Sequence, residues 1–137
     1  MNFLFDHNLP PSWARGLDSL SKDKFGSDVG RVVTLRDQFP QNTADPEWLG
    51  TLGKEGDWAV ISSDFFRKSK AEREVIRQYG LSVFVLGKAW HEKHPFWPRT
   101  AQLMHWWPRI VVHANTVSKA AVEVPWRTSG KFIQISL

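Results

Sequence analysis

Short apolar runs alternate along the chain with longer segments in which apolar residues recur every three or four positions. This is the pattern of buried strands separated by amphipathic helices. The apolar runs predict strands at residues 1–5, 32–35, 58–62 and 81–86. The segments between them predict helices from Pro11 to about Lys22, from Asp45 to Gly53 or Gly56, and from about Ser69 to Gly80. The alternating order predicts an α/β fold with a parallel sheet and crossover helices.

The apolar stripes also predict which helical residues face the sheet. They are Leu9, Trp13, Leu17 and Leu20 for the first helix, Trp48, Leu49 and Leu52 for the second, and Ala71, Val75, Ile76 and Tyr79 for the third. Asp45 is expected to cap the second helix, because Asp-Pro-Glu is the order of cap, proline and acid that a helix N-terminus favours. The uncharged run 81–86 is expected to lie inside the sheet.

The pattern weakens after the fourth strand. Residues 88–94 are expected to form a loop, and residues 96–107 a helix that Pro108 kinks or breaks. Residues 121–124 and 132–135 alternate weakly on either side of a Thr-Ser-Gly turn. They predict a terminal hairpin or two edge strands.

Composition adds a bias toward polyanionic partners. A net charge of +4 and a pI near 9.6 favour contact with phosphates, although many basic proteins bind no nucleic acid. The eight tryptophans could stack on bases, but most large aromatic residues in a domain of this size fill its core. The absence of cysteine excludes thiol catalysis and cysteine-ligated zinc.

Nothing in the sequence predicts a membrane segment or a second domain. No apolar run approaches the roughly 20 residues of a membrane helix, and no basic region precedes the first apolar segment. Together with the absence of cysteine, this favours a cytoplasmic protein without membrane association. No long linker interrupts the 137 residues, so we expect residues 1–137 to form a single domain.

Three aspartates lie where the predicted topology brings distant segments together. Asp6 ends the first strand, Asp64 follows the third, and Asp45 opens the second helix. Because the carboxyl ends of parallel strands share one edge, these carboxylates could converge on Mg²⁺ or Mn²⁺ and support phosphodiester hydrolysis. The alternatives are local, since Asp6 and Asp64 could each only stabilise a turn and Asp45 could only cap its helix.

Further polar residues near these aspartates have open roles. Glu72 is either a fourth catalytic carboxylate or the partner of Ser69 in a capping box. Asn8 could orient a water or a metal ligand, or form a turn before Pro10. Four basic residues flank Asp64 and could bind a substrate phosphate, although a basic run is often only solvated. They are Arg67, Lys68, Lys70 and Arg73.

Other catalytic patterns have little support in the sequence. The histidines of His91-Glu92-Lys93-His94 are three positions apart, whereas the zinc protease motif needs them four apart with Glu next to the first. We therefore expect a structural or surface role for this segment. A serine hydrolase is not indicated either, since no Gly-x-Ser-x-Gly pattern occurs.

The order of these motifs resembles a PIN-like domain of the small prokaryotic branch related to VapC-type toxin ribonucleases. The resemblance rests on the segments Phe5-Asp6-His7-Asn8-Leu9-Pro10-Pro11, Asp45-Pro46-Glu47-Trp48 and Val60-Ile61-Ser62-Ser63-Asp64, followed by Lys70-Ala71-Glu72-Arg73-Glu74. It covers residues 1–86 well and the C-terminal third loosely. The compact segment before Asp45, and an Asp where that family often has Glu, depart from its pattern.

The resemblance implies a three-layer α/β/α sandwich and metal-dependent cleavage of RNA. Asp6, Asp45 and Asp64 would be the ligands of Mg²⁺ or Mn²⁺, with Glu72 as a further catalytic acid. It also implies a toxin of a type II toxin–antitoxin system, with a cognate antitoxin protein as partner and with dimerisation common in the family. Two other functions remain open, namely a catalytically inactive module that binds nucleic acid or protein, and a nuclease acting on DNA.

Overall fold

The computed structural model describes the backbone of residues 1–137 and the side chains of all of them except Glu92. The strands are β1 (Asn2–Phe5), β2 (Val32–Thr34), β3 (Trp58–Ser62), β4 (Ser82–Leu86), β5 (Ala121–Val124) and β6 (Ile133–Gln134). The helices are α1 (Pro11–Ser21), α2 (Leu35–Gln38), α3 (Asp45–Glu55), α4 (Lys70–Tyr79), α5 (Ala89–Glu92) and α6 (Phe96–Thr116), with a 3-10 turn at Gly26–Asp28.

The strands form one sheet in the order β2-β1-β3-β4-β5-β6. β1 to β5 run parallel to one another, and β6 pairs antiparallel with β5. Thr34, Phe5 and Ile61 are neighbours in register near the ends of β2, β1 and β3. The carboxyl ends of the parallel strands therefore meet at one edge, as the sequence predicts. The expected internal position of β4 and the antiparallel terminal pair are also confirmed.

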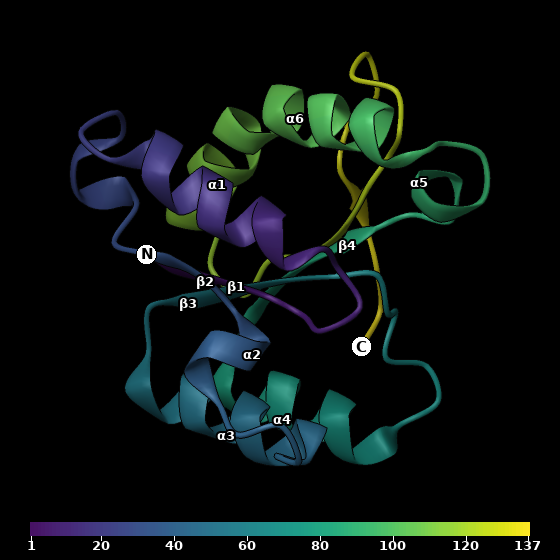
Figure 1. The fold of residues 1–137 in the computed structure, drawn as a ribbon. Coiled ribbons are helices and arrows are strands. Elements are labelled where there is room, and N and C mark those ends of the chain that lie inside the picture. Colours follow the sequence, from purple (N-terminus) through teal and green to yellow (C-terminus); the bar gives the residue numbers. More distant parts are fainter.

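Helices cover both faces of this sheet (Figure 1). α1 and α6 pack on one face, where Phe3, Phe5 and Phe84 belong to the same buried cluster as Trp13 and Trp106 of the helices. α3 and α4 pack on the other face, in a second buried cluster of strand residues and helix residues. Successive strand residues point to opposite faces, so the two clusters alternate along β1. The α/β/α sandwich predicted from the sequence is thus confirmed.

Most tryptophans fill the core. Six of the eight are at most 3% exposed, namely Trp13, Trp48, Trp58, Trp90, Trp106 and Trp107. Trp97 is 76% exposed at the start of α6. The packing interpretation therefore accounts for most of the aromatic content, and Trp97 is the residue with a ring open to solvent stacking.

Two helical details differ from the prediction. Leu20 is 61% exposed, because the buried stripe of α1 continues through Ala14 to Ser21, whose Oγ accepts a hydrogen bond from Nε1 of Trp107 at 2.9 Å. Leu35 begins a short helix, α2, where the end of a strand and a loop were expected.

The expected loop at residues 88–94 contains the short helix α5. Trp90 anchors it, since its ring is fully buried and its Nε1 donates to the carbonyl oxygen of Val124 at 2.9 Å. The sequence pattern alone does not show this anchor, because the acceptor belongs to β5.

The prediction of a break at Pro108 was wrong, since α6 continues for eight residues beyond it. Ile110, Val111 and Ala114 extend the buried face of the helix past the proline. Their burial offsets the hydrogen bond that a proline removes from a helix. Although α6 has 21 residues, no helix in the described part of the chain is long and apolar enough to cross a membrane.

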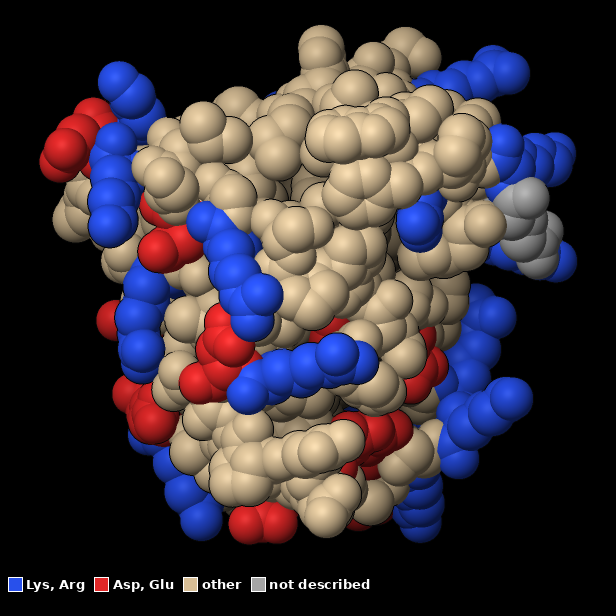
Figure 2. Space-filling view, in the orientation of Figure 1, with Lys and Arg blue, Asp and Glu red and all other residues tan. Residues whose placement is uncertain are grey.

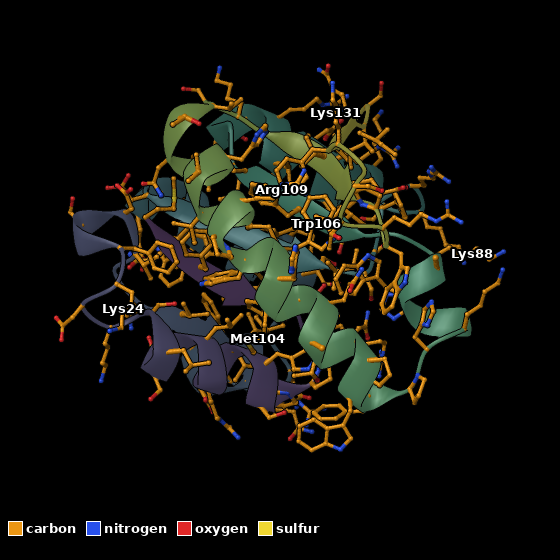
Figure 3. All side chains as sticks on the ribbon, turned by 90° about the horizontal axis from the view of Figure 1, so that it is seen from above. Lys24, Lys88, Met104, Trp106, Arg109 and Lys131 are labelled. Carbon is orange, nitrogen blue, oxygen red and sulfur yellow. The ribbon has the colours of Figure 1, made fainter. Side chains whose placement is uncertain are left out.

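Arg109 fastens the C-terminal segment to α6 (Figure 3). Its guanidinium lies 3.8 Å from the ring centroid of Trp106 and donates to the carbonyl oxygens of Thr128 at 2.7 Å and Gly130 at 2.9 Å. A planar cation suits this combination of stacking and forked hydrogen bonding. The segment between β5 and β6 is thereby held against the helix.

Replacing Arg109 with Met should lower the free energy of unfolding by about 1 kcal/mol, because the aliphatic stem is kept while the stacking and both hydrogen bonds are lost. Urea denaturation followed by tryptophan fluorescence measures the change. Lys131→Met, on the same segment, is the matched control and should change the stability by less than about 0.5 kcal/mol. Equal losses in both variants would contradict this role of Arg109.

Candidate active site

Asp6 is a buried carboxylate at the carboxyl edge of the sheet. It directly follows β1 and is 4% exposed. Its Oδ2 accepts a hydrogen bond from Oγ of Ser62 at 3.0 Å, and its Oδ1 accepts from the backbone N–H of His7 at 2.6 Å. Nδ1 of His7 lies 2.8 Å from the same Oδ1. The local turn interaction is therefore present, but it is joined by a contact from a different strand.

Asp64 is connected to Asp6 through Ser62. Its backbone N–H donates to Oγ of Ser62 at 2.9 Å, while the same hydroxyl donates to Asp6. Its Oδ1 accepts from the N–H of Phe66 at 2.8 Å, and Phe66 has a φ of 59° with its ring 2% exposed. Positive φ is unusual for a bulky residue and is often found near functional sites. The loop after β3 therefore holds the exposed Asp64 in one orientation.

Asp45 and Glu72 form a second acidic pair. Glu72 is 6% exposed on α4 and shares a hydrogen bond with Asp45 at the start of α3. Burial raises the pKa of Glu72 to about 7, with further contributions from the hydrogen bond to Asp45 and from the negative charges of Asp45 and Asp64. The carboxylates of three different segments thus influence one another at this edge of the sheet.

The expected cap role of Asp45 was wrong. Ala44 occupies the N-cap position and Asp45 is the first residue of α3, with its Oδ1 accepting from Nε1 of Trp48 at 2.9 Å. The fully buried indole of Trp48 directs this carboxylate away from the capping position. Asp45 is consequently available to pair with Glu72.

The structure contains the predicted capping box of Ser69 and Glu72, and it also places Glu72 beside another acid. Oγ of Ser69 accepts from the N–H of Glu72 at 3.2 Å, as in a capping box, and Ser69 also hydrogen-bonds the Glu72 side chain. Of the residues predicted to face the sheet from α4, Ala71 is exposed and Glu72 beside it is buried, whereas Ile76 is buried and Val75 packs against the core as predicted. Glu72 therefore faces the other acids as well as supporting its helix.

The basic residues around Asp64 fall into two groups. The guanidinium of Arg67 lies 4.7 Å from the ring centroid of Phe65, and Lys68 is exposed beside it. Lys70 is exposed and lies 3.8 Å from Glu74, whereas Arg73 donates to the carbonyl oxygens of Phe66 and Arg67. Arg73 thus supports the loop that carries Asp64. Its predicted contact with substrate, and those of Arg67, Lys68 and Lys70, stay predictions.

The surface around this edge carries charges of both signs. The right-hand margin of Figure 2, where Figure 1 places α5 and the segment between β3 and α4, gathers Lys and Arg beside acidic side chains. Asn8 is exposed on the turn after Asp6. Its predicted role beside the acids stays a prediction.

Two hollows open at the same edge. One, of about 440 Å³, is lined by His7, Asp45 and residues of the segment that contains α2, including Arg36. The other, of about 500 Å³, is lined by Ser63 and Arg67 and by residues from β4, α5 and β5. Asp45 thus lines the first hollow, and Ser63 and Phe65, the neighbours of Asp64 in the chain, line the second.

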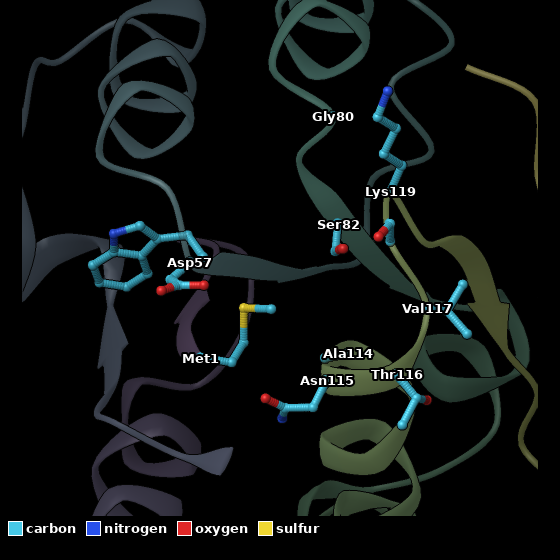
Figure 4. A pocket seen from close by; sticks show the side chains of 11 residues that line it. Met1, Asp57, Gly80, Ser82, Ala114, Asn115, Thr116, Val117 and Lys119 are labelled. Atoms are coloured by element: carbon cyan, nitrogen blue, oxygen red, sulfur yellow. The ribbon is translucent and has the colours of Figure 1, made fainter. Parts of the chain in front are cut away.

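A third hollow, of about 370 Å³, lies at the opposite edge of the sheet (Figure 4). It is lined by residues at the amino ends of the strands, including Met1, Asp57 and Ser82, and by Lys119 beside Gly80. Because the four acids lie at the carboxyl edge, this hollow is not part of the same site.

The acids fit a divalent cation in their chemistry. Carboxylate oxygens are the ligands that Mg²⁺ and Mn²⁺ prefer. A cation would also offset the negative charges of Asp45 and Asp64, which add to the effect of burial in raising the pKa of Glu72. Among the described side chains, however, no three Asp, Glu or His residues lie close enough together to hold one ion. A metal site at Asp6, Asp45 and Asp64 would therefore need movement of these side chains toward one another.

A comparison with known families matches residues 1–88 to the PIN-like domain. The chain belongs to the PIN-like domain family. PIN-like domains are generally nucleases and typically use divalent metal ions. No curated protein and no solved structure matches the chain. All four acids of this PIN-like domain lie in the matched residues, whereas α5, α6, β5 and β6 lie beyond them.

The structure adds two residues that the sequence analysis did not assign. Ser62, fully buried at the end of β3, joins Asp6 to Asp64, and His7 lies against Asp6. The sequence feature that could have indicated Ser62 is its position at the end of the apolar run 58–62, directly before the loop that carries Asp64. His94, which follows α5, agrees with a structural interpretation, since it stacks on Trp126 with ring centroids 3.6 Å apart.

Proposed function

We propose that this PIN-like domain is a metal-dependent endoribonuclease and the toxin component of a type II toxin–antitoxin system. The observation that supports this best is the placement of four acids, in two linked pairs, at the carboxyl edge of the sheet. Ser62 joins Asp6 and Asp64, while Asp45 pairs with Glu72. A cognate antitoxin protein and a homodimer belong to the same proposal.

The residues of this edge have distinct tasks in the proposed reaction. Asp6, Asp45 and Asp64 would hold Mg²⁺ or Mn²⁺, which when bound neutralises phosphate charge and makes water more acidic. Ser62 fixes the carboxylate of Asp6 and the backbone of Asp64, so that both are oriented before substrate arrives. Burial raises the pKa of Glu72 to about 7, so its carboxyl group can take up or release a proton near neutral pH. Arg67 and Lys68 would bind the phosphates of the RNA strand.

Cleavage by purified protein should depend on Mg²⁺ or Mn²⁺ and stop with excess EDTA. The measurement is a gel assay on RNA, single-stranded DNA and duplex DNA of the same sequence, with RNA expected to be cut. An Asp64→Asn variant purified in the same way controls for contaminating ribonuclease. Cutting that persists in EDTA would contradict metal dependence, and preferential cutting of DNA would contradict the assigned substrate.

A second candidate function is a binding module without hydrolysis. It is favoured by the spacing of the acids, since no three of the described Asp, Glu and His side chains are close enough to hold an ion. Such a module would bind RNA with strong salt dependence and with no effect of EDTA. Tight binding without cleavage under any metal would favour it over the nuclease.

The toxin assignment has its own test. Expression of the chain alone should arrest growth, and expression of the Asp64→Asn variant at the same level should not. The wild-type chain purified from its native source should carry a stoichiometric protein partner. Unimpaired growth with an active nuclease would separate the toxin role from the enzymatic one.

A further inference from the structure

The hollow of about 500 Å³ beside Asp64 has the composition of a base-binding pocket rather than a simple phosphate site. Six of its lining residues carry the argument, and they come from the loop after β3, the end of β4, α5 and β5. They are Ser63, Phe65, Arg67, Lys88, His91 and Glu123. Its volume lies within the range of small-ligand pockets, roughly 300–1,000 Å³.

The position of this pocket links it to the acids. Ser63 lies between Ser62, which binds Asp6, and Asp64 itself. A nucleic-acid strand with one phosphate at the acids would therefore place an adjacent nucleotide in the pocket. Two of the lining residues, His91 and Glu123, lie outside the residues matched by the PIN-like family. The C-terminal third of the chain therefore completes a pocket that the PIN-like region begins.

The cationic and aromatic side of the pocket suits a nucleotide. Arg67 stacks on Phe65 at 4.7 Å, and together they offer a flat surface on which a base can stack. Lys88, at the margin beside α5 in Figure 3, adds a second cation to the lining. These groups would bind any nucleotide, so they do not by themselves select a base.

Glu123 supplies the selective group. It is the carboxylate among the lining residues and is partly buried on β5. Its side chain lies over Gly87, where an added Cβ would come within 3.2 Å of the carboxyl Cδ and Oε2. The absence of a side chain at Gly87 therefore makes room for the carboxylate at the pocket.

A carboxylate accepts hydrogen bonds and donates none. Guanine presents two adjacent donors, N1–H and the N2 amino group, which match the two oxygens of a carboxylate. Adenine and cytosine present one amino group beside a ring acceptor, and uracil presents one N–H between two carbonyls. Resting on the proposed nuclease function, we propose that this pocket binds a guanine base of single-stranded RNA next to the phosphate that is cleaved.

The test is binding of two fluorescent heptamer RNAs in EDTA, one entirely of adenosine and one with a central guanosine. Fluorescence anisotropy at fixed salt should show about tenfold tighter binding of the guanosine RNA, as expected for one bidentate contact. Glu123→Gln should remove this preference and retain the binding of the adenosine RNA. Gly87→Ala, which displaces the carboxylate without removing it, should reduce the preference.

Glu55→Gln is the matched control, since Glu55 lies at the far end of α3 and its Oε2 accepts from Nε1 of Trp58 at 2.8 Å. It should keep the guanosine preference. Circular dichroism confirms that each variant is folded. Equal binding of both RNAs by the wild-type protein, or an unchanged preference in Glu123→Gln and Gly87→Ala, would overturn the proposal.

Because binding is measured without metal, this test is independent of cleavage. A guanosine preference in a protein that cuts nothing would overturn the nuclease function and support the pocket. Cleavage without any guanosine preference would support the nuclease and overturn the pocket. With both present, the cut in the guanosine RNA should fall at one of the two phosphates that flank the guanosine.

Discussion

Replacing Asp6 by Asn should lower the rate of RNA cleavage by about a thousandfold, which corresponds to about 4 kcal/mol of transition-state stabilisation. The change removes the negative charge that would hold the cation. The fold should survive, because the amide oxygen of Asn can accept from the backbone N–H of His7 while its N–H group donates to Oγ of Ser62. The rate is measured under single-turnover conditions at saturating Mn²⁺.

Asp64→Asn should cause a loss of similar size, since it removes the negative charge of a second proposed ligand of the cation. Asp23→Asn is the control, because Asp23 is exposed after α1 and has a φ of 61°, a conformation that Asn adopts readily. Thermal unfolding should show little change for all three variants. Full cleavage by both Asp6→Asn and Asp64→Asn would exclude the proposed site.

The second large effect concerns the pH dependence of stability. The pKa of Glu72 is about 7 in the folded protein, against 4.5 for an ordinary glutamate. The folded state therefore binds this proton more tightly than the unfolded state does. The stabilisation from the proton is complete below about pH 4.5 and is lost as the pH rises through 7.

Glu72→Gln should abolish this loss, because Gln stays neutral. At pH 8 without metal, the variant should be more stable than the wild type by on the order of 1–2 kcal/mol, allowing for partial screening by water. At pH 4.5 the two proteins should be nearly equal in stability. Melting temperatures between pH 4.5 and 8 measure the difference, with Glu74→Gln as the control on the exposed face of α4.

The same experiment distinguishes charge repulsion from a capping role. If Glu72 only stabilised its helix through Ser69, its replacement would lower stability at every pH. Added Mn²⁺ should raise the melting temperature of the wild type more than that of Glu72→Gln, since a nearby cation stabilises the buried negative charge of Glu72. A variant that is less stable at pH 8 would contradict the crowding of acids at this edge.

The central strands were predictable from sequence because the sheet is covered on both faces. Strands such as Trp58–Ser62 then consist almost entirely of apolar residues, and the predicted and observed bounds agree. Pro108 shows where a prediction from local sequence fails. A proline is unfavourable inside a helix, but buried residues on both sides of it outweigh that local preference.

The position of the candidate site in the fold was predictable from sequence, but the hydrogen bonds between its side chains were not. Strand order places Asp6 and Asp64 at one edge, whereas the hydrogen bond from Ser62 depends on the register of β1 with β3. Phe5 is opposite Ile61, so the next residues, Asp6 and Ser62, come together. The burial of Glu72 likewise depends on Asp45 from another helix, and local periodicity does not contain that information.

The two edge strands of the sheet influence how copies of the chain can associate. β2 at one margin has three residues and β6 at the other has two, while β3 and β4 in the centre have five each. Such short margins expose few unpaired backbone groups, so they resist edge-to-edge aggregation into a continuous sheet. A homodimer of this protein would therefore associate through its helices and loops, and the chain should remain dispersed at concentrations where a long exposed strand would form fibrils.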